Sequence, residues 1–344
     1  MAFQPNANLD QFAVSLAEDF RQVVDDNVFS SNTVMANSWP DSEQRPPGRW
    51  LAVPILSAKN NNAVAFGQYD VVPGAASTIL SAATFPWSFY TCGLNMSWQE
   101  LRMIQGPNER VDLVAAQLET AIASMNDVIG NDLCNYTGKS KSTPNGVNAY
   151  GIVEATDNGT LVNVYGSISR TGTNSFANWQ GQVNGKLVAS GIGSAANDPS
   201  PALFYTTYTA CTQGRQTPTN IYSSRQGVAS YMYVLQAQQR FASGDIANPG
   251  FGGAALFGAV IEADDHIVNP VNNSNIGCNF YFINKNHTHF YHMGPKKGSE
   301  FIPWVANADG SIAQTCRYVI GLQYASSQPR TGGSIPYVNT LSNL

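Results

Sequence analysis

Charged side chains are scarce in this sequence. Only 12 % of its 344 residues are Asp, Glu, Lys or Arg, where about a quarter is usual. The polar surface must therefore come from neutral side chains, and about one residue in ten is Asn. Such surfaces fit proteins that are covered by neighbours, because charge is depleted at the centre of interfaces. Adaptation to salt or to secretion explains the same composition equally well, so composition alone leaves both readings open.

Basic residues are few and scattered. The chain has 18 Lys and Arg, a net charge of −5 and no basic run, which argues against a tight grip on nucleic-acid phosphates. The N-terminus lacks a basic segment followed by an apolar one, so no signal peptide is expected. No stretch approaches the ~18 apolar residues of a membrane span. We therefore expect a protein made in the cytoplasm, without a membrane partner.

Cysteine and histidine are also rare. The five cysteines are dispersed and form no C-x-x-C pair, which predicts reduced, mostly buried thiols and no disulfides. His287, His289 and His292 form the one histidine cluster. On a strand, His287 and His289 share a face and would both reach a metal ion, with His292 on the other face, but no Asp or Glu in the stretch completes the ligand set. We expect a partly exposed histidine pair and no metal site.

Motifs for catalysis are missing. Neither a phosphate-binding glycine loop nor a G-x-S-x-G nucleophile turn occurs in its proper context. Glu262, Asp264, Asp265 and His266 form an acidic turn after a predicted strand, and carboxylates beside a histidine suit acid–base chemistry or calcium binding. The spacing is not that of an EF-hand, and turn formation before an Asn-Pro step explains these residues. We expect no catalytic or cofactor-binding residues.

The strongest pattern present is a long amphipathic helix over residues 107–136. Pro107 suits its first turn, and Glu109 and Asp112 place negative charge at the positive end of the helix dipole. A helix of this length is roughly 45 Å long, which exceeds the width of a compact domain of this size. Apolar residues recur along it every three or four positions, at Val111, Val114, Leu118, Ile122, Met125, Ile129 and Leu133.

The segments before this helix are of different kinds. The apolar pattern of residues 9–24 predicts a short amphipathic helix with Phe12 and Phe20 on one side. A Pro-, Ser- and Asn-rich arm follows it. Two apolar runs, residues 51–58 and 64–72, then flank a Lys-Asn-Asn-Asn turn and predict a β-hairpin.

After the long helix, helices and strands alternate. Helices are predicted over residues 175–191, 199–214 and 225–241. The segment 199–214 starts with Pro and ends with Gly, which is the arrangement expected of a helix. The predicted strands are rich in β-branched or aromatic residues, and they cover residues 219–224, 252–265, 278–293 and 315–327.

This order of parts resembles the major capsid proteins of tailed bacteriophages, which have the Hong Kong 97-type fold. The stretch WLAVPILSAKNNNAVAFGQYDVV resembles the extended loop that overlaps a neighbouring subunit, and the long helix resembles the spine helix of that family. Gly151-Ile152, Gly166 to Arg170 and Trp179 resemble features at the start of the axial domain. The resemblance covers residues 49–344, and the collinear order of the parts carries it.

The resemblance implies an α+β fold with four parts. These are an N-terminal arm (residues 1–48), an extended β-hairpin loop (49–95), a peripheral domain with the spine helix (96–140 and 270–344) and an axial domain (141–269). Subunit contacts are then expected from the extended loop and the arm, and the candidates are Trp50, Lys59, Asn60, Asn61, Tyr69, Phe12 and Phe20. Some relatives crosslink a loop Lys to an Asn of another subunit; Lys59 lies in a suitable region, but we expect no crosslink.

The implied function is that of a major capsid protein. It would self-assemble as hexamers and pentamers into the icosahedral shell that encloses the double-stranded DNA of a tailed phage, formed in the cytoplasm of a bacterial host. Implied partners are a separate scaffolding protein, a portal protein and, as a further candidate, a decoration protein, with only weak, non-specific contact to DNA. Two alternatives stay open: another virion component of the tail or tube, and a hydrolase with an unrecognised site.

Overall fold

The computed structural model describes residues 32–57, 60, 62–71, 74, 79–97, 99, 107–136, 146–172, 176–184, 201–236, 254–267, 271–272, 275–294, 299–306 and 313–339. The helix predicted over residues 9–24, with Phe12 and Phe20, lies outside these residues. Lys59 and Asn61 lie outside them as well.

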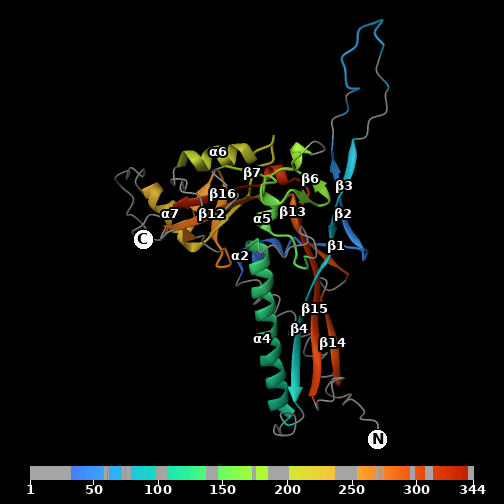
Figure 1. The fold of residues 1–344 in the computed structure, drawn as a ribbon, viewed down its shortest axis with the longest axis vertical. Coiled ribbons are helices and arrows are strands. Elements are labelled where there is room, and N and C mark those ends of the chain that lie inside the picture. Colours follow the sequence, from blue (N-terminus) through green and yellow to red (C-terminus); the bar gives the residue numbers. More distant parts are fainter. Residues whose placement is uncertain are drawn as a thin grey trace.

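Helix α4 (Pro107–Cys134) is one continuous helix of 28 residues, about 42 Å long at 1.5 Å per residue. It runs beside the long strands of the lower part of the molecule (Figure 1). From Leu118 to Leu133 its buried residues follow one another by one, three or four positions, as expected for one apolar face. The predicted spine helix is therefore confirmed. No helix in the described part of the chain is long and apolar enough to cross a membrane.

A five-stranded sheet lies next to α4. Its central strand, β15, pairs with β4 along one edge and with β13 and β14 along the other, and β1 adds in parallel to β13. Apolar residues of β4, β14 and β15 pack on α4. The strands are β1 (Glu43–Arg45), β4 (Ser88–Ser97), β13 (Thr288–Met293), β14 (Ser299–Ala306) and β15 (Ala313–Ser326).

A seven-stranded sheet forms the second half of the molecule, in the order β7-β16-β12-β8-β10-β9, with β11 paired to β12. Helices α6 (Pro201–Cys211) and α7 (Arg225–Gln236) contribute Phe204 and Tyr231 to one core cluster with Phe280 of β12. The strands are β7 (Gln182–Val183), β8 (Asn220–Ser223), β9 (Ala254–Leu256), β10 (Ala259–Ala263), β11 (Val271–Asn272), β12 (Asn275–Ile283) and β16 (Gly333–Asn339).

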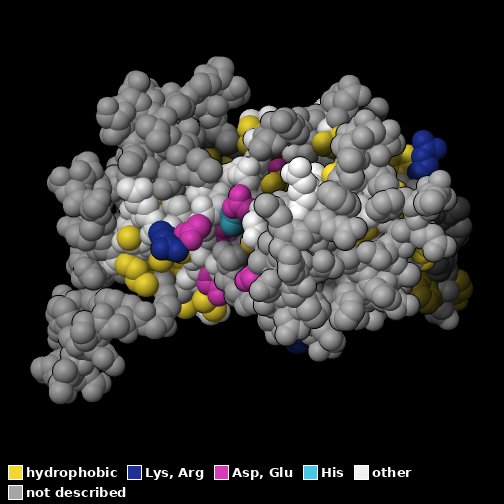
Figure 2. Space-filling model, turned by 90° about the horizontal axis from the view of Figure 1, so that it is seen from below, with side chains coloured by type: hydrophobic (Ala, Val, Ile, Leu, Met, Phe, Trp, Pro, Cys, Tyr) yellow, Lys and Arg dark blue, Asp and Glu magenta, His cyan; other side chains and the backbone are white. Residues whose placement is uncertain are grey.

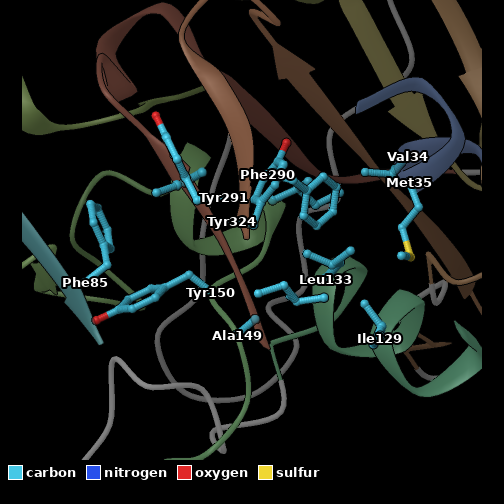
Figure 3. Packing of buried hydrophobic residues seen from close by; sticks show 14 of the residues in the cluster. Val34, Met35, Phe85, Ile129, Leu133, Ala149, Tyr150, Phe290, Tyr291 and Tyr324 are labelled. Carbon is cyan, nitrogen blue, oxygen red and sulfur yellow. The ribbon is translucent and has the colours of Figure 1, made fainter. Parts of the chain in front are cut away.

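The main core lies where the two sheets, α4 and the short helices α2 (Thr33–Ser38) and α5 (Ile152–Thr156) meet. Figure 3 shows Leu133 and Ile129 of α4 pointing toward residues from α2 and from β13 and β15. Trp39 packs edge-on against Phe290 with ring centroids 5.4 Å apart. Segments that are distant in the sequence share this core. The C-terminal part of the long helix and the seven-stranded sheet both contribute residues to it.

A two-stranded hairpin of β2 (Trp50–Leu56) and β3 (Leu80–Pro86) stands apart from both sheets. The segment between these strands projects from the molecule (Figure 1). A second small hairpin of β5 (Val164–Tyr165) and β6 (Ile168–Ser169) lies against its base. Two 3₁₀ turns, η1 (Ala177–Trp179) and η3 (Pro329–Thr331), complete the described elements.

Several predicted elements are confirmed. Helices α6 and α7 and strand β8 lie within the segments predicted for them, and β15 begins two residues before its predicted start at residue 315. The hairpin is confirmed as an element, but its predicted pairing is wrong. The partner of β2 is residues 80–86, and the described residues 62–71 form no strand, because β3 is anchored by core contacts that are remote in sequence.

Three further predictions need correction. The helix predicted over residues 175–191 is in its described part a 3₁₀ turn followed by β7, which pairs with β16. The strand predicted over residues 252–265 is two strands, β9 and β10, joined at Phe257-Gly258. The strand predicted over residues 278–293 is β12 and β13, which a turn over residues 284–287 sends into different sheets. In each case a local turn interrupts an apolar pattern.

The sheet pairings divide the described part of residues 270–344 between the two sheets, and they leave the predicted domain boundaries untested. Strands β12 and β16 belong to the seven-stranded sheet, and only β13 to β15 belong to the sheet beside α4. Strand β4, predicted within the extended loop over residues 49–95, pairs with β15 along its whole length.

Candidate assembly surface

The β2–β3 hairpin is apolar on both of its faces. Every second residue of β2 is buried, as expected for a strand with one face on the core. Outward-facing strand residues are ordinarily polar. Leu56, however, is 70 % exposed, and Leu80, its partner on β3, is 66 % exposed. The outward residues of β2 carry no charge and, apart from the indole N–H of Trp50, no polar side-chain group; they are Trp50, Ala52, Pro54 and Leu56.

The projecting segment continues this apolar character and has few charges. Tyr69 is 90 % exposed, and a turn closes next to it, in which Asp70 accepts a hydrogen bond from the Gly67 N–H at 2.6 Å. Between residues 50 and 97 the sequence holds only two charged side chains, Lys59 and Asp70. Exposed apolar patches of this extent mark interaction surfaces. The other large exposed apolar residues of the segment are Val64, Phe66 and Val71.

The base of the hairpin is held by aromatic packing. Phe85 of β3 meets Tyr150 and Tyr165 edge to face, with ring centroids 5.3 and 5.0 Å apart. The Thr84 N–H donates to the Gly166 carbonyl at 2.9 Å. A Cβ at Gly166 would lie 2.7 Å from the Phe85 ring, and Gly166 has a φ of +58°, so glycine alone fits this turn. The hairpin therefore projects from a rigid base.

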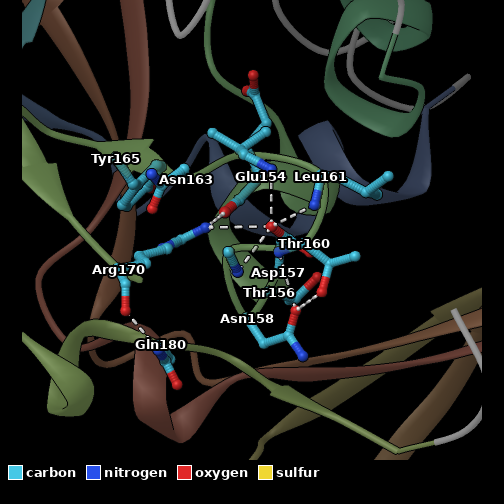
Figure 4. Close-up of polar contacts among 12 residues, drawn as sticks. Glu154, Thr156, Asp157, Asn158, Thr160, Leu161, Asn163, Tyr165, Arg170 and Gln180 are labelled. Atoms are coloured by element: carbon cyan, nitrogen blue, oxygen red, sulfur yellow. Dashed lines mark hydrogen bonds and ion pairs between the residues drawn. The ribbon is translucent and has the colours of Figure 1, made fainter. Parts of the chain in front are cut away.

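A buried cation supports the same base (Figure 4). Arg170 is fully buried and lies over the Tyr165 ring, 4.4 Å from its centroid. Its guanidinium donates to the carbonyls of Glu154 and Trp179 at 2.7 and 3.1 Å, and the Asp157 carboxylate lies 3.9 Å away. Burial lowers the pKa of Arg170, but an arginine keeps its charge in proteins. The buried charge is thus held by hydrogen bonds on several sides.

Asp157 organises the loop next to this cation. Its Oδ2 accepts hydrogen bonds from the backbone N–H groups of Gly159, Leu161 and Val162, at 2.9, 3.2 and 2.9 Å. With three N–H groups on its Oδ2, the buried carboxylate faces the Arg170 guanidinium, and the two opposite charges offset one another. The segments that resemble the start of an axial domain, Gly166 to Arg170 and Trp179, therefore form the support of the hairpin.

The described interface candidates are all at the surface. Trp50 is half exposed, with the Arg49 guanidinium 5.2 Å from the centre of its ring, and Asn60 and Tyr69 are exposed. Sequence reasoning missed Leu56 and Leu80 as candidates. The absence of any polar residue from WLAVPIL was the available signal, because a half-buried strand should alternate.

A second exposed apolar group lies at the other end of the molecule. Phe257, in the turn between β9 and β10, has a φ of +48°, which is rare for an aromatic residue. Its ring packs against the tilted rings of Tyr205 and Tyr208 of α6, with centroids 5.2 and 5.1 Å apart. The seven-stranded sheet ends here at β9.

The histidine cluster is not brought together as a metal site. His287 belongs to the turn before β13, and His289 and His292 lie on opposite faces of that strand. Burial and the neighbouring His289 lower the pKa of His287. His289 contacts the Asn286 carbonyl at 3.1 Å. In the part of the chain that the structure describes, no three His, Cys, Asp or Glu side chains are placed to share a metal ion.

The side chains of the acidic turn likewise make separate contacts with different parts of the molecule. Glu262 accepts a hydrogen bond from Asn37, Asp265 pairs with Arg225 at 2.5 Å, and Asp264 is buried. A cleft of about 490 Å³ lies instead at the base of the hairpin, and among its lining residues that the structure describes only His287 is titratable. His266 does not line this cleft. Glu262, Asp264 and Asp265 are not among its described lining residues either.

None of the five cysteines forms a disulfide bond, and four are buried, as the sequence predicted for its thiols. Burial raises the pKa of Cys211 to about 12 and also raises the pKa of Cys278. These thiols are therefore protonated at neutral pH. Cys92, on β4, is half-buried.

The arrangement of the described parts matches those of solved shell structures. The capsid of a native GTA particle is similar with a TM-score of 0.59 and 9 % identity, over 86 % of this chain and 88 % of that chain. The cyanophage A-1(L) capsid is similar with a TM-score of 0.58 and 13 % identity, over 84 % and 88 %. The holo-SrpI encapsulin complex from Synechococcus elongatus is similar with a TM-score of 0.53 and 10 % identity, over 88 % of each chain.

No protein-family model matches the sequence, and no curated protein is similar to it in sequence. At these identities the structural likeness defines the fold. The chain is an α+β protein with the Hong Kong 97-type capsid fold. The expectation drawn from the order of its parts is confirmed at this level.

Proposed function

We propose that the chain is the major capsid protein of a tailed bacteriophage. It assembles, as hexamers and pentamers, into the icosahedral shell that encloses the double-stranded DNA genome, and it acts as a structural protein without enzymatic activity. Its location is the shell of the virion, formed in the cytoplasm of a bacterial host. A separate scaffolding protein, a portal protein and a decoration protein are its proposed partners.

The observation that carries the proposal is the hairpin with two apolar faces. A single chain covers one face with its own core and leaves Leu56 and Leu80 in water. Burying such a face contributes roughly 25 cal/mol per Å² of apolar surface. A second copy of the chain supplies this cover when the hairpin of one subunit lies over its neighbour. Trp50, Lys59, Asn60, Asn61 and Tyr69 are the contact residues proposed for this overlap, with Phe12 and Phe20 proposed for the arm.

The charge of the chain supports a container for nucleic acid. The net charge of −5 gives weak, non-specific contact with DNA, because tight binding requires clustered Lys and Arg. A shell wall of this kind encloses DNA without holding it. The scarcity of charge, which the sequence left open between two readings, then follows from coverage by neighbouring subunits.

The test is electron microscopy of the protein expressed alone and together with the scaffolding protein encoded in the same genome. We expect closed hollow shells of uniform size. Tubes would favour a tail or tube component, and monomers under all conditions would overturn the proposal. Nuclease protection of DNA in particles isolated from infected cells then separates a phage capsid from a shell that encloses other cargo.

A further inference from the structure

Asp264 joins three elements that are far apart in the sequence. Its Oδ2 accepts a hydrogen bond from the Val34 N–H of α2 at 2.9 Å, and its Oδ1 accepts one from the His266 N–H at 2.9 Å. The thiol of Cys134, at the end of α4, lies beside it. Burial and the Asp264 carboxylate raise the pKa of Cys134 well above its usual value, so this thiol stays neutral. The carboxylate itself is fully buried.

The His266 ring extends this junction to the surface of α4. Its Nδ1 lies 3.3 Å from Asp264 Oδ1, and its Nε2 lies 3.0 Å from Asp127 Oδ1. The ring packs close to the helix at Gly130, where a Cβ would come within 3.0 Å of it. The underside of the molecule shows a histidine among acidic side chains (Figure 2). We call these two contacts of His266 the His266 bridge.

Both contacts of the ring are hydrogen bonds to ionised carboxylates only when each ring nitrogen carries an N–H group. A neutral imidazole has one N–H and one lone pair, whereas the imidazolium has two N–H groups. Carboxylates accept hydrogen bonds and have none to donate when ionised. A neutral His266 would therefore point one lone pair at a carboxylate oxygen, and only the protonated ring satisfies both partners.

We propose that the His266 bridge is a proton-dependent connection between the long helix α4 and the seven-stranded sheet. Protonated His266 holds Asp127 and Asp264 at the same time. When the ring loses a proton, it keeps one partner and releases the other. The proposal concerns contacts within one chain, so it holds whether or not the chain forms shells.

Solvent exposure decides which partner is released. The Asp127 side chain is 78 % exposed, and that of Asp264 is fully buried. Water replaces a lost hydrogen bond at Asp127 at little cost. Asp264 keeps the N–H groups of Val34 and His266, but a ring lone pair turned toward this buried carboxylate would be strongly unfavourable. The remaining N–H therefore stays with Asp264. Loss of the proton frees α4 at Asp127, while the Asn135 side chain continues to donate to the His266 carbonyl at 2.6 Å.

The other charged groups near the bridge are engaged elsewhere. On its own turn, Asp265 pairs with Arg225 of α7. Glu262 accepts hydrogen bonds from Asn37 and Asn220. From α2, the neutral amide of Asn32 lies against Gly130. Asp127 and Asp264 are thus the carboxylates whose oxygens face the ring.

The experiment is amide hydrogen exchange on the purified full-length chain at about pH 5.5 and about pH 8, on either side of the range in which histidine titrates. Rates are corrected for the intrinsic effect of pH. We expect protection of residues 127–135 to fall about threefold at the higher pH, the size of a partly exposed ion pair. Unchanged protection in the wild-type chain would overturn the proposal.

Two variants identify the bridge as the cause. The side chain of H266Q does not titrate and cannot become a cation, so its protection should be low and the same at both pH values. In D127N the new amide can accept a hydrogen bond from a ring N–H or donate one to a ring lone pair. Its contact with either form of the ring is therefore kept, and its protection should also be independent of pH. The matched controls H289Q and D265N should keep the wild-type response. A wild-type response in H266Q, or its loss in H289Q, would assign the effect to other groups.

Discussion

Phe85 and Tyr165 meet edge to face, with ring centroids 5.0 Å apart and planes inclined by 72°. Phe85 belongs to the hairpin that projects from the molecule, and Tyr165 belongs to the small β5–β6 hairpin at its base. Arg170 lies on the other side of this contact, over the Tyr165 ring. The chain thus has a packed, charge-supported base for a segment whose outer surface is apolar and uncovered. This combination suits a subunit that reaches onto a neighbour.

Replacing Gly166 should loosen this base. The change G166A forces Ala into a φ of +58° and places its Cβ 2.7 Å from the Phe85 ring, whereas G172A places Ala at a φ of +104° in open space. We expect G172A to lower the free energy of unfolding by about 1 kcal/mol through backbone strain. Overpacking should cost G166A about 1–3 kcal/mol more. Denaturant unfolding measures both; equal losses would mean that the contact with Phe85 does not matter.

Removing the buried cation should be more costly. In R170M the Asp157 carboxylate and the Glu154 and Trp179 carbonyls lose their partner. We expect a loss of about 3–5 kcal/mol in the free energy of unfolding, because one partner of a buried ion pair is left alone. The control R225M removes an exposed pair with Asp265 and should leave stability unchanged in the same thermal or denaturant measurement. Similar stability of the two variants would contradict the role given to Arg170.

Charge on the outer face of the hairpin should stop assembly without unfolding the chain. L56D changes a side chain that is already in solvent, so circular dichroism and the melting temperature should match the wild type. In a shell the same carboxylate would be buried without a partner, at a cost of several kcal/mol. Sedimentation should then show subunits in place of particles. The control V305D, at an exposed valine of β14, should assemble; normal particles from L56D would exclude this face from the contact.

Thiol labelling should separate Cys92 from the buried cysteines. Burial raises the pKa of Cys211 to about 12, so roughly one thiol in ten thousand is ionised at about pH 8. The pKa of Cys92 is also raised by burial, and its rate of alkylation should rise with pH, but its side chain is partly accessible. We expect iodoacetamide to modify Cys92 first in the native chain. Mass spectrometry of C92S should show no rapid modification, and rapid labelling of Cys211 would contradict the packing of α6.

Local patterns were enough to predict the elements whose contacts repeat regularly along the chain. The long helix was predictable because its apolar residues follow the helical repeat, and α6 because Pro and Gly lie at its two ends. The pairing of the hairpin strands was not predictable in this way. A long segment joins β2 and β3, and their register depends on Phe85 entering the core. The turn at residues 284–287 was missed because its flanking strands share one apolar composition.

The His266 bridge likewise has one part that the sequence predicts and one part that it does not. The acidic turn is visible in the sequence, but Asp127 lies 139 positions away from His266 and carries no local sign of the contact.

The sequence by itself determined a long amphipathic helix, a chain poor in charge and the order of parts typical of a capsid fold, because periodicity and composition are properties of neighbouring residues. Only the tertiary structure decided which strands pair, which apolar face remains uncovered and which carboxylates surround His266. Those outcomes depend on the packing of segments that are remote in the chain, and burial is a property of the whole fold.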